Sequence, residues 1–389
     1  MRAGIIGHLL SFESSYRQAG VSRYTEALVR ELPRRSPGDT FVVFTGPDRP
    51  PSDRDFDASV EWAHSRAPTG RPLIRIAWEQ TVGFMVARRH RLDLVHAPVN
   101  VTPLVTLCPR VVTIHDLAFH HFPEQYPGPQ QRYLRAMTRL SVRRATRVIA
   151  VSEATRQDVI VTYGCAPERV VTVPNGVSTE FRPLPEDVVA AFRKSEGLAE
   201  HFILFLGTLQ PRKNLETLLR AYARAHTDAG WSLVVAGAAG WSYDPIFDMA
   251  RDLGLADKVR FAGYVPPERL PLWYNAAGML VYPSLYEGFG LQLVEAMACG
   301  TPVIASNTSS LPEVVGNAGL LVGARDVDGF ARAIVTLARS PEMRADLRAR
   351  GVRRAASFSW EATADRTLSV YREAVAESRR QRLPRERRA

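Results

Sequence analysis

Residues 279–300 read MLVYPSLYEGFGLQLVEAMACG, and this stretch decides the fold. The apolar run that ends at the Pro-Ser pair 283–284 predicts a short buried strand. A second run of apolar and small residues begins at position 291 and predicts a helix. Gly288 and Gly290 fall between the two, where a turn or a nearby ligand requires backbone freedom. A strand, a short loop and a helix in this order form the repeating unit of a doubly wound α/β sheet.

The same unit recurs in both halves of the chain. In the first half we expect strands at Ala3–Gly7, Phe41–Thr45, Asp93–Ala97, Val111–His115, Arg147–Val151 and Val170–Pro174, and helices at Val21–Leu32, Ile74–Arg89, Gln130–Ala145 and Glu153–Tyr163. In the second half we expect strands at Phe202–Gly207, Ser232–Gly237, Val259–Ala262, Met279–Tyr282, Pro302–Ser306 and Gly319–Val322, with helices between them and three more at the end. Because strands separated by helices form parallel sheets through right-handed crossovers, two doubly wound, Rossmann-like α/β domains are predicted. The two prolines of residues 181–185 mark the join, and a ligand is expected at the carboxyl ends of the strands, in a cleft between the domains.

Length and composition set the class of protein. The 389 residues are 46% hydrophobic and 23% charged, which is typical of globular proteins and excludes a disordered or fibrous chain. No uncharged apolar stretch is long enough for a spanning helix, and the apolar run at residues 1–7 is too short for a signal peptide, so we expect a cytoplasmic protein. The three cysteines lack the spacing of metal ligands, so neither a zinc site nor a disulfide framework is expected.

The net charge of +10 is unevenly distributed. Residues 378–389 carry six arginines and one glutamate, so this tail supplies half of the charge. A stripe of four more arginines recurs at helical spacing within 130–145: Arg132, Arg135, Arg139 and Arg143. Solvated faces are the simpler interpretation of both. The alternative is that stripe and tail together attach the protein peripherally to an anionic membrane surface.

The stretch GTLQPRKNL at residues 207–215 follows a predicted strand and predicts an anion site. Arg212 and Lys213 precede a helix start, where backbone N–H groups and the helix dipole favour a diphosphate. Lys213 is one of only three lysines in the chain, which indicates that a compact ammonium is required there. Asn214 is expected to cap the helix. The alternative is an ordinary basic helix start, and the mononucleotide motif GxxxxGK[ST] is absent.

Glu287 and Glu295 lie eight positions apart around the predicted strand-to-helix loop. That separation is about two helical turns, which would place both carboxylates on nearly the same helix face. Two carboxylates aimed into one cleft can hold hydroxyl groups of a sugar and a ribose. A surface helix with two solvated glutamates is the alternative, but the helix is otherwise apolar and small.

These residues, together with VPNGV at 173–177, resemble the retaining GT-B glycosyltransferases of family 4, also called group 1 glycosyltransferases, and especially their mannosyltransferases. The resemblance runs from the first strand to about Tyr371. It implies that residues 1–180 bind the acceptor and 181–371 bind a nucleotide sugar, with a C-terminal helix of about 372–389 returning to the first domain.

The resemblance also implies roles for individual residues. Glu287 would face the donor sugar and His115 would lie near the reacting sugar, as the catalytic pair. Glu295 would hold the ribose, while Arg212 and Lys213 would hold the diphosphate. The remaining donor contacts would come from Gly20, Tyr264, Val265, Gly288, Phe289 and Gly290. The chain departs from the family pattern at three places. Gln292 stands where the family often has proline, and Thr208 where many members have arginine. Ala19 or Ser22 stands where many relatives have a further glycine.

Three further polar features have simpler interpretations. Ser152 and Ser310 precede predicted helices and are expected to be helix caps, Ser310 within a capping box. The aspartates 53, 55 and 57 form a D-x-D string, but they lie in a loop rich in proline and aspartate. We therefore expect a solvated loop and no essential metal or other cofactor. His115 on its own would more often be structural, but its place at the end of a strand favours a role in the cleft.

The implied function is retaining transfer of a hexose, mannose or glucose, from GDP-mannose or UDP-glucose to a glycan, lipid-linked or small-molecule acceptor. A sugar-nucleotide epimerase on the same scaffold is the closest alternative, and it would turn over donor without acceptor. A nicotinamide-dependent oxidoreductase is disfavoured because residues 4–7 open no GxGxxG turn. A nucleic-acid binder is disfavoured because the arginines accompany no aromatic platform.

Overall fold

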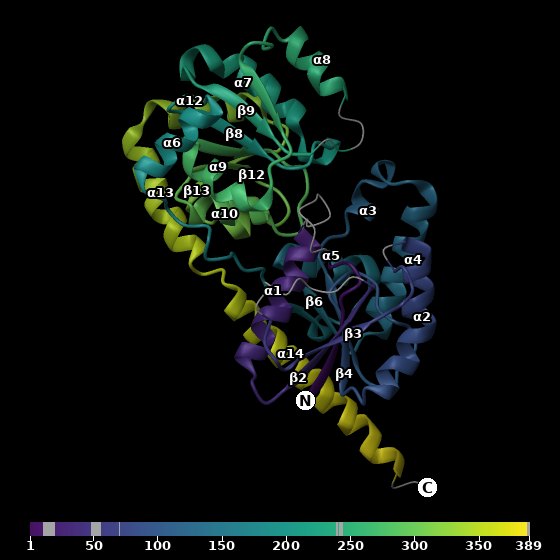
Figure 1. Cartoon of the computed structure of the whole chain (residues 1–389). Helices are drawn as coiled ribbons and strands as arrows, with labels where there is room; N and C mark the ends of the chain where they lie inside the picture. The colour runs from purple at the N-terminus through teal and green to yellow at the C-terminus, as the bar shows by residue number, and fades with distance from the viewer. Residues whose placement is uncertain (11–19, 48–55, 70, 239, 241–243, 387–389) are drawn as a thin grey trace. The chain divides into compact units, whose positions relative to one another are not determined.

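The chain folds into two compact units (Figure 1). The computed structural model describes residues 1–10, 20–47, 56–69, 71–238, 240 and 244–386. One unit combines Met1–Gly176 with Trp360–Ala389, and the other is Val177–Ser359. Each unit is built on one parallel sheet with helices on both faces, so the prediction of two doubly wound α/β domains is confirmed.

The sheet of the first unit has seven parallel strands in the order β3-β2-β1-β4-β5-β6-β7. Their bounds are β1 Arg2–Ile6, β2 Thr40–Thr45, β3 Val60–His64, β4 Leu94–Ala97, β5 Arg110–Ile114, β6 Arg147–Ala150 and β7 Val170–Thr172. The central strands are short runs of Val, Ile, Leu and Ala that are buried on both faces, as a sheet covered by helices requires. The order in which successive strands are added to the sheet reverses between β1 and β4. Ligands bind at such a reversal in doubly wound folds.

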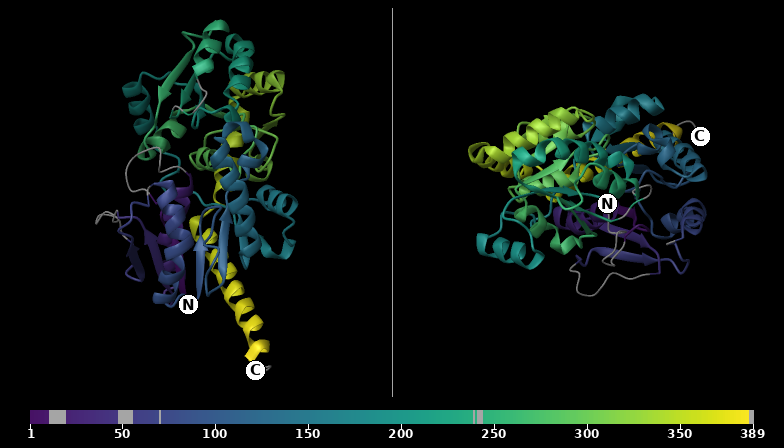
Figure 2. Two further views of the ribbon diagram at one scale, coloured as in Figure 1. Left: turned by 90° about the vertical axis from the view of Figure 1, so that its right-hand side faces the viewer. Right: turned by 90° about the horizontal axis from the view of Figure 1, so that it is seen from above.

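Helices cover both faces of this sheet. They are α1 Gly20–Arg35, α2 Pro72–Arg89, α3 Ala118–His121, α4 Gly128–Arg144, α5 Glu153–Tyr163 and α14 Trp360–Glu386. One core cluster joins α1 and α14 to the sheet through side chains such as Leu28 and Leu368. The opposite cluster joins α2, α4 and α5 through Trp78, Val142 and Val159. Figure 2 shows α14, in yellow, running along this unit to the C-terminus.

The second unit has a six-stranded parallel sheet in the order β10-β9-β8-β11-β12-β13. The strands are β8 Phe202–Leu206, β9 Ser232–Ala236, β10 Val259–Gly263, β11 Met279–Tyr282, β12 Val303–Ser306 and β13 Gly319–Val322. The helices are α6 Glu186–Glu196, α7 Leu215–Ala229, α8 Asp244–Asp252, α9 Leu270–Ala276, α10 Leu291–Ala298, α11 Leu311–Val315, α12 Val327–Arg339 and α13 Pro341–Ala355. In this sheet the order of strand addition reverses between β8 and β11. A ligand is therefore expected at the carboxyl ends of these two strands.

The boundaries between the units correct the predicted ones. The chain passes from the first unit to the second at residues 176–177 and returns to the first at 359–360. We expected these two crossings at 180–181 and at about 371–372. The difference arises because α14 already begins at Trp360, and Trp360, Ala364 and Leu368 are buried in the core of the first unit. Val177 and Ser359 form a β-bridge, so the two crossings are adjacent.

One strand was missed by the sequence analysis. β3 is an edge strand whose residues Val60–His64 alternate only weakly between buried and exposed positions, and a polar loop precedes it. The strands and helices that were predicted with bounds are present, with ends shifted by up to three residues. Among the described residues, no helix has the length and hydropathy to cross a membrane.

Candidate functional site

Glu287 lies in the loop that connects β11 to α10. The strand ends at Tyr282, and the helix begins only at Leu291. The expectation that Glu287 and Glu295 share a helix face is therefore wrong, because Glu287 precedes the helix. Gly290 ends the loop with φ of 103°, and a Cβ there would lie 2.9 Å from a Leu311 methyl group. Glycine is thus required to turn the chain into α10.

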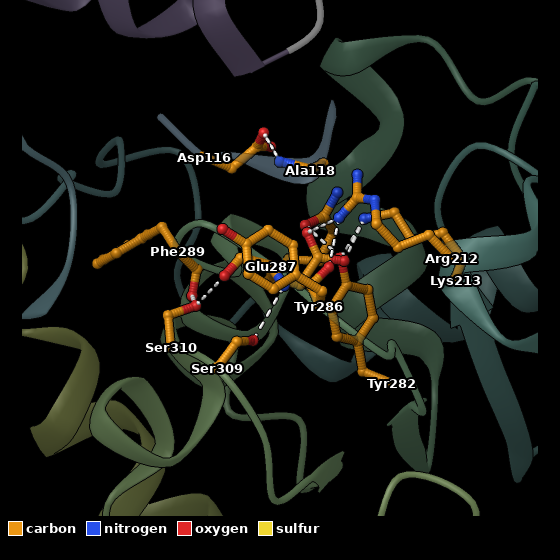
Figure 3. Close-up of polar contacts among 11 residues, drawn as sticks. Asp116, Ala118, Arg212, Lys213, Tyr282, Tyr286, Glu287, Phe289, Ser309 and Ser310 are labelled. Atoms are coloured by element: carbon orange, nitrogen blue, oxygen red, sulfur yellow. Dashed lines mark hydrogen bonds and ion pairs between the residues drawn. The ribbon is translucent and has the colours of Figure 1, made fainter. Parts of the chain in front are cut away.

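Glu287 pairs with both cations of the predicted anion site (Figure 3). Lys213 Nζ donates to Glu287 Oε1 over 2.6 Å, and Arg212 Nη1 lies 3.3 Å from Oε2. Lys213 and Glu287 are only 6% and 8% exposed. Burial alone would raise the pKa of Glu287, but the charges of Lys213 and Arg212 outweigh it and lower that pKa to about 2. The carboxylate is therefore ionised at neutral pH.

Tyr282 completes this cluster, although the sequence analysis did not single it out. Its hydroxyl accepts a hydrogen bond from Lys213 Nζ at 2.6 Å and donates one to Glu287 Oε1 at 3.0 Å. Burial and the negative charge of Glu287 raise the pKa of Tyr282 well above its usual value, so the phenol stays protonated. A tyrosine as the last residue of a strand that precedes a charged loop was the signal available in the sequence.

The loop that carries Glu287 is fixed from two sides. On one side, Arg212 donates to the carbonyl of Tyr286, and the N–H of Leu285 donates to the carbonyl of Arg212 at 2.9 Å. On the other side, the N–H of Glu287 donates to Ser309 Oγ at 3.0 Å, and Ser310 Oγ bonds to the carbonyls of Glu287 and Phe289 at 2.9 Å (Figure 3). These bonds hold the carboxylate in place before any ligand binds.

Two of the predicted caps serve this loop region instead of a helix. Ser310 makes no side-chain cap bond and has helical backbone angles, so the expected capping box is wrong. Asn214 precedes α7 with left-handed angles and makes no side-chain cap bond either. Its amide nitrogen donates to the carbonyls of Pro283 and Ala324 at 2.9 and 2.7 Å, which ties the Arg-Lys segment to the end of β11. Ser152 is a cap as predicted, since it accepts from the N–H of Thr155.

The sequence of the chain matches two families of known proteins. Residues 19–181 match the family described as Glycosyltransferase Family 4, and residues 189–354 match Glycosyl transferases group 1. The chain is 36% identical over 265 residues to O-antigen chain mannosyltransferase B of Escherichia coli. The aligned region covers 67% of this chain and 70% of that protein. The chain belongs to the group 1 glycosyltransferases. It is thus a transferase enzyme, as predicted.

Solved structures agree with this assignment at the level of the fold. Sucrose-phosphate synthase from Thermosynechococcus elongatus is similar with a TM-score of 0.77 and 23% identity, covering 97% of this chain and 99% of that chain. Anabaena HepE, solved in complex with UDP and glucose, is similar with a TM-score of 0.73 and 20% identity, covering 96% and 100%. The glycosyltransferase therefore has the GT-B fold, which confirms the predicted fold class.

Apart from Gly20, the remaining residues predicted to contact the donor lie on several elements of the second unit. Glu295 on α10 is 1% exposed, and its Oε2 accepts a hydrogen bond from Tyr274 at 2.9 Å. Phe289 is buried beside Phe358, with ring centroids 5.6 Å apart, and its neighbours Gly288 and Gly290 are buried as well. Directly after β10, Tyr264 is 41% exposed and Val265 is buried. Their contacts with ribose, sugar and base stay predictions.

His115 and Gly20 belong to the first unit. Gly20 is exposed at the start of α1, and His115 follows β5. His115 Nε2 lies 2.7 Å from the carbonyl of Pro98, which can only accept, so this nitrogen carries the proton. Burial lowers the pKa of His115, and the neutral ring then presents Nδ1 as an acceptor. The catalytic role of His115 stays a prediction.

The aspartate string and the arginine stripe were the features on which the metal and membrane expectations rested. Aspartates 53 and 55 lie outside the described residues, and Asp57 accepts hydrogen bonds from the backbone and hydroxyl of Ser59. In the described part of the chain, no group of His, Cys, Asp or Glu side chains is arranged to hold a metal ion. On α4, Arg132, Arg139 and Arg143 are exposed, whereas Arg135 is partly buried and donates to the carbonyl of His120.

Proposed function

We propose that the protein is a retaining hexosyltransferase that moves mannose, or alternatively glucose, from a nucleoside diphosphate donor to a glycan, lipid-linked or small-molecule acceptor. The observation that carries this proposal is the cluster of the buried Lys213 and Glu287 with the partly buried Arg212, at the carboxyl ends of β8 and β11. Mannose is favoured because the E. coli relative is a mannosyltransferase, and UDP-glucose is the second choice because HepE was solved with UDP and glucose.

The chemistry follows from the charges of the cluster. Breaking the bond between sugar and diphosphate builds negative charge on the leaving oxygens and positive charge at the anomeric carbon. Arg212 and Lys213 stabilise the leaving oxygens. Glu287 is ionised, so it cannot act as an acid, and it stabilises the sugar side instead. Acceptor attack on the face from which the diphosphate leaves preserves the anomeric configuration, and no second carboxylate is assigned as a nucleophile.

The acceptor and the location of the enzyme belong to the same proposal. The first unit binds the acceptor, and it also supplies Gly20 as a donor contact and His115 as a catalytic residue at the carboxyl edge of its sheet. The enzyme works in the cytoplasm, peripherally bound to an anionic membrane through the arginines of α4 and the end of α14. No cofactor is required, so chelator is expected to leave turnover unchanged.

The test is to incubate the protein with GDP-mannose or UDP-glucose, with and without an acceptor, and to follow product by NMR. We expect an α-linked product from the α-linked donor. A β-linked product would overturn retention. An isomerised nucleotide sugar formed without acceptor would restore the epimerase alternative, which the transferase relatives do not support.

A further inference from the structure

A second group of polar side chains lies at the carboxyl edge of the first unit's sheet. His8 follows β1 directly, while Arg75, Trp78 and Glu79 lie in the first two turns of α2. Their spacing of three and four residues places these three on one face of the helix. Because α2 packs antiparallel to the strands of a doubly wound sheet, its first turns lie at the edge where the strands end. That is the edge at which such sheets bind ligands.

Within the described part of the chain, the buried imidazole of His8 makes no hydrogen bond. It is 7% exposed, and its ring packs edge-on against Trp78 with centroids 4.3 Å apart. Burial and, to a lesser degree, the charge of Arg75 lower the pKa of His8 to about 4, so the ring is neutral at pH 7. A neutral imidazole offers one donor and one acceptor, and a hydroxyl group matches both.

Glu79 is a buried carboxyl group with a distant counter-charge. It is 7% exposed, and its Oε1 lies 3.9 Å from Arg75 Nε, beyond hydrogen-bond distance. Burial raises the pKa of Glu79 to about 7, even though Arg75 lowers it. The protonated and ionised forms are then both populated at neutral pH, so this carboxyl can donate to or accept from a hydroxyl group. Tyr133 on α4 lies close enough for the charges of Glu79 and Arg75 to act on its pKa, which burial raises to about 12.

We propose that His8, Arg75 and Glu79 form an acceptor subsite for an uncharged sugar ring, whose hydroxyl groups they bind. The proposal rests on the proposed function and adds where and how the acceptor is held. Arg75 alone would favour a phosphorylated acceptor, but Glu79 offsets its charge one helical turn away. A neutral ring satisfies the imidazole and the carboxyl without placing a phosphate beside a carboxylate.

Two acceptor probes test the subsite: methyl α-D-mannopyranoside and mannose 6-phosphate, each with GDP-mannose or UDP-glucose, whichever the wild type uses. We expect the wild type to prefer the neutral probe in kcat/KM. In Glu79→Gln, the KM for methyl mannoside should rise about tenfold or more, the effect of losing one hydrogen bond to a charged group, with a smaller change in kcat and in donor KM. The preference for the neutral probe should also shrink, because Arg75 is no longer offset. His8→Leu should raise the same KM without changing that preference.

The matched control is Glu124→Gln, an exposed glutamate of the same unit that has no part in either site. A KM for methyl mannoside that is unchanged in both Glu79→Gln and His8→Leu overturns the subsite. A wild type that prefers mannose 6-phosphate overturns it as well. So does a wild type that turns over donor but transfers the sugar to neither probe. A wild type that neither binds nor turns over donor overturns the proposed function instead. If Glu79→Gln does not fold, as judged by circular dichroism, His8→Leu decides the result.

Discussion

Glu287 illustrates how a single carboxylate can organise a binding site. It lies between Lys213 and Arg212, where we propose that the donor phosphates bind, and it balances the charges of the buried Lys213 and the partly buried Arg212. Charges of one sign buried without a counter-ion would be costly. Under the proposed function, the two cations would redirect part of their hydrogen bonding from the carboxylate to phosphate oxygens when the donor binds.

Removing the ammonium should therefore affect both binding and stability. In Lys213→Ala, nucleoside diphosphate affinity should fall by about 1.5 to 3 kcal/mol, the range for hydrogen bonds to charged groups. Because Lys213 proves to be half of a buried pair, we expect the free energy of unfolding to fall by about 3 kcal/mol. Calorimetry and urea unfolding measure the two effects, and Lys258→Ala, at an exposed lysine, is the control. Unchanged nucleotide affinity would contradict the phosphate role.

The lowered pKa of Glu287 predicts an acid-labile contribution to stability. Its pKa in the folded protein is about 2, below the ordinary value of 4.5, so the folded state favours the ionised form. The stabilisation is complete above pH 4.5 and is lost as the pH falls from there towards 2. The stability difference between wild type and Lys213→Ala, measured by urea unfolding, should therefore shrink as the pH is lowered through this range. A difference that stays constant would show that the pair does not set the pKa.

Replacing Glu287 with glutamine should separate chemistry from binding. We expect turnover in Glu287→Gln to fall by about a hundredfold or more, since removing one electrostatic stabiliser of a transition state has an effect of that order. Affinity for nucleoside diphosphate should be kept or improved, because the two cations lose a competing carboxylate. Steady-state kinetics and calorimetry give the two values, with Glu268→Gln, an exposed glutamate, as the control. Turnover close to wild type would remove Glu287 from the mechanism.

At the scale of elements, the loop after β11 is held by the segment before α11. Ser310→Ala removes the hydroxyl that bonds to the carbonyls of Glu287 and Phe289, which should cost about 1 kcal/mol of stability and allow the carboxylate to move. Turnover should fall about tenfold with a smaller change in nucleotide affinity, because misplacement affects the transition state most. Thermal unfolding and kinetics test this, and Ser357→Ala, an exposed serine, should behave like wild type. Equal losses in Ser357→Ala would leave the bracing role unsupported.

The same elements show what could be predicted from the sequence. The central strands were predictable because a sheet covered on both faces demands short, continuous apolar runs. The edge strand β3 was not, because an edge position imposes no such run. Asn214 and Ser310 have the side chains of helix caps, yet they bond to loops that are distant in sequence. Arg212, Lys213 and Glu287 were predicted as a site. Their direct pairing depends on the neighbouring positions of β8 and β11, which only the fold supplies.

At the scale of the whole molecule, the positive charge predicts reversible attachment to an anionic membrane. Each arginine near such a surface contributes about 1 kcal/mol, so several together suffice for weak, salt-sensitive binding. We expect anionic liposomes to sediment the protein at low salt and release it at high salt. Binding should weaken when Arg132, Arg139 and Arg143 are changed to glutamine, but not when Arg224, Arg332 and Arg353 of the second unit are changed. Equal binding to neutral liposomes, or none to either, would leave the stripe as a solvated face.

The early start of α14 has a consequence for the order in which the enzyme is completed during its synthesis. The second unit is one continuous segment, so all of its residues are synthesised before residue 360. The first unit begins earlier but must wait for Trp360, Leu368 and Tyr371 to cover one face of its sheet. The second unit can therefore finish folding before the first unit. A premature stop within the last thirty residues would accordingly damage the first unit and spare the second.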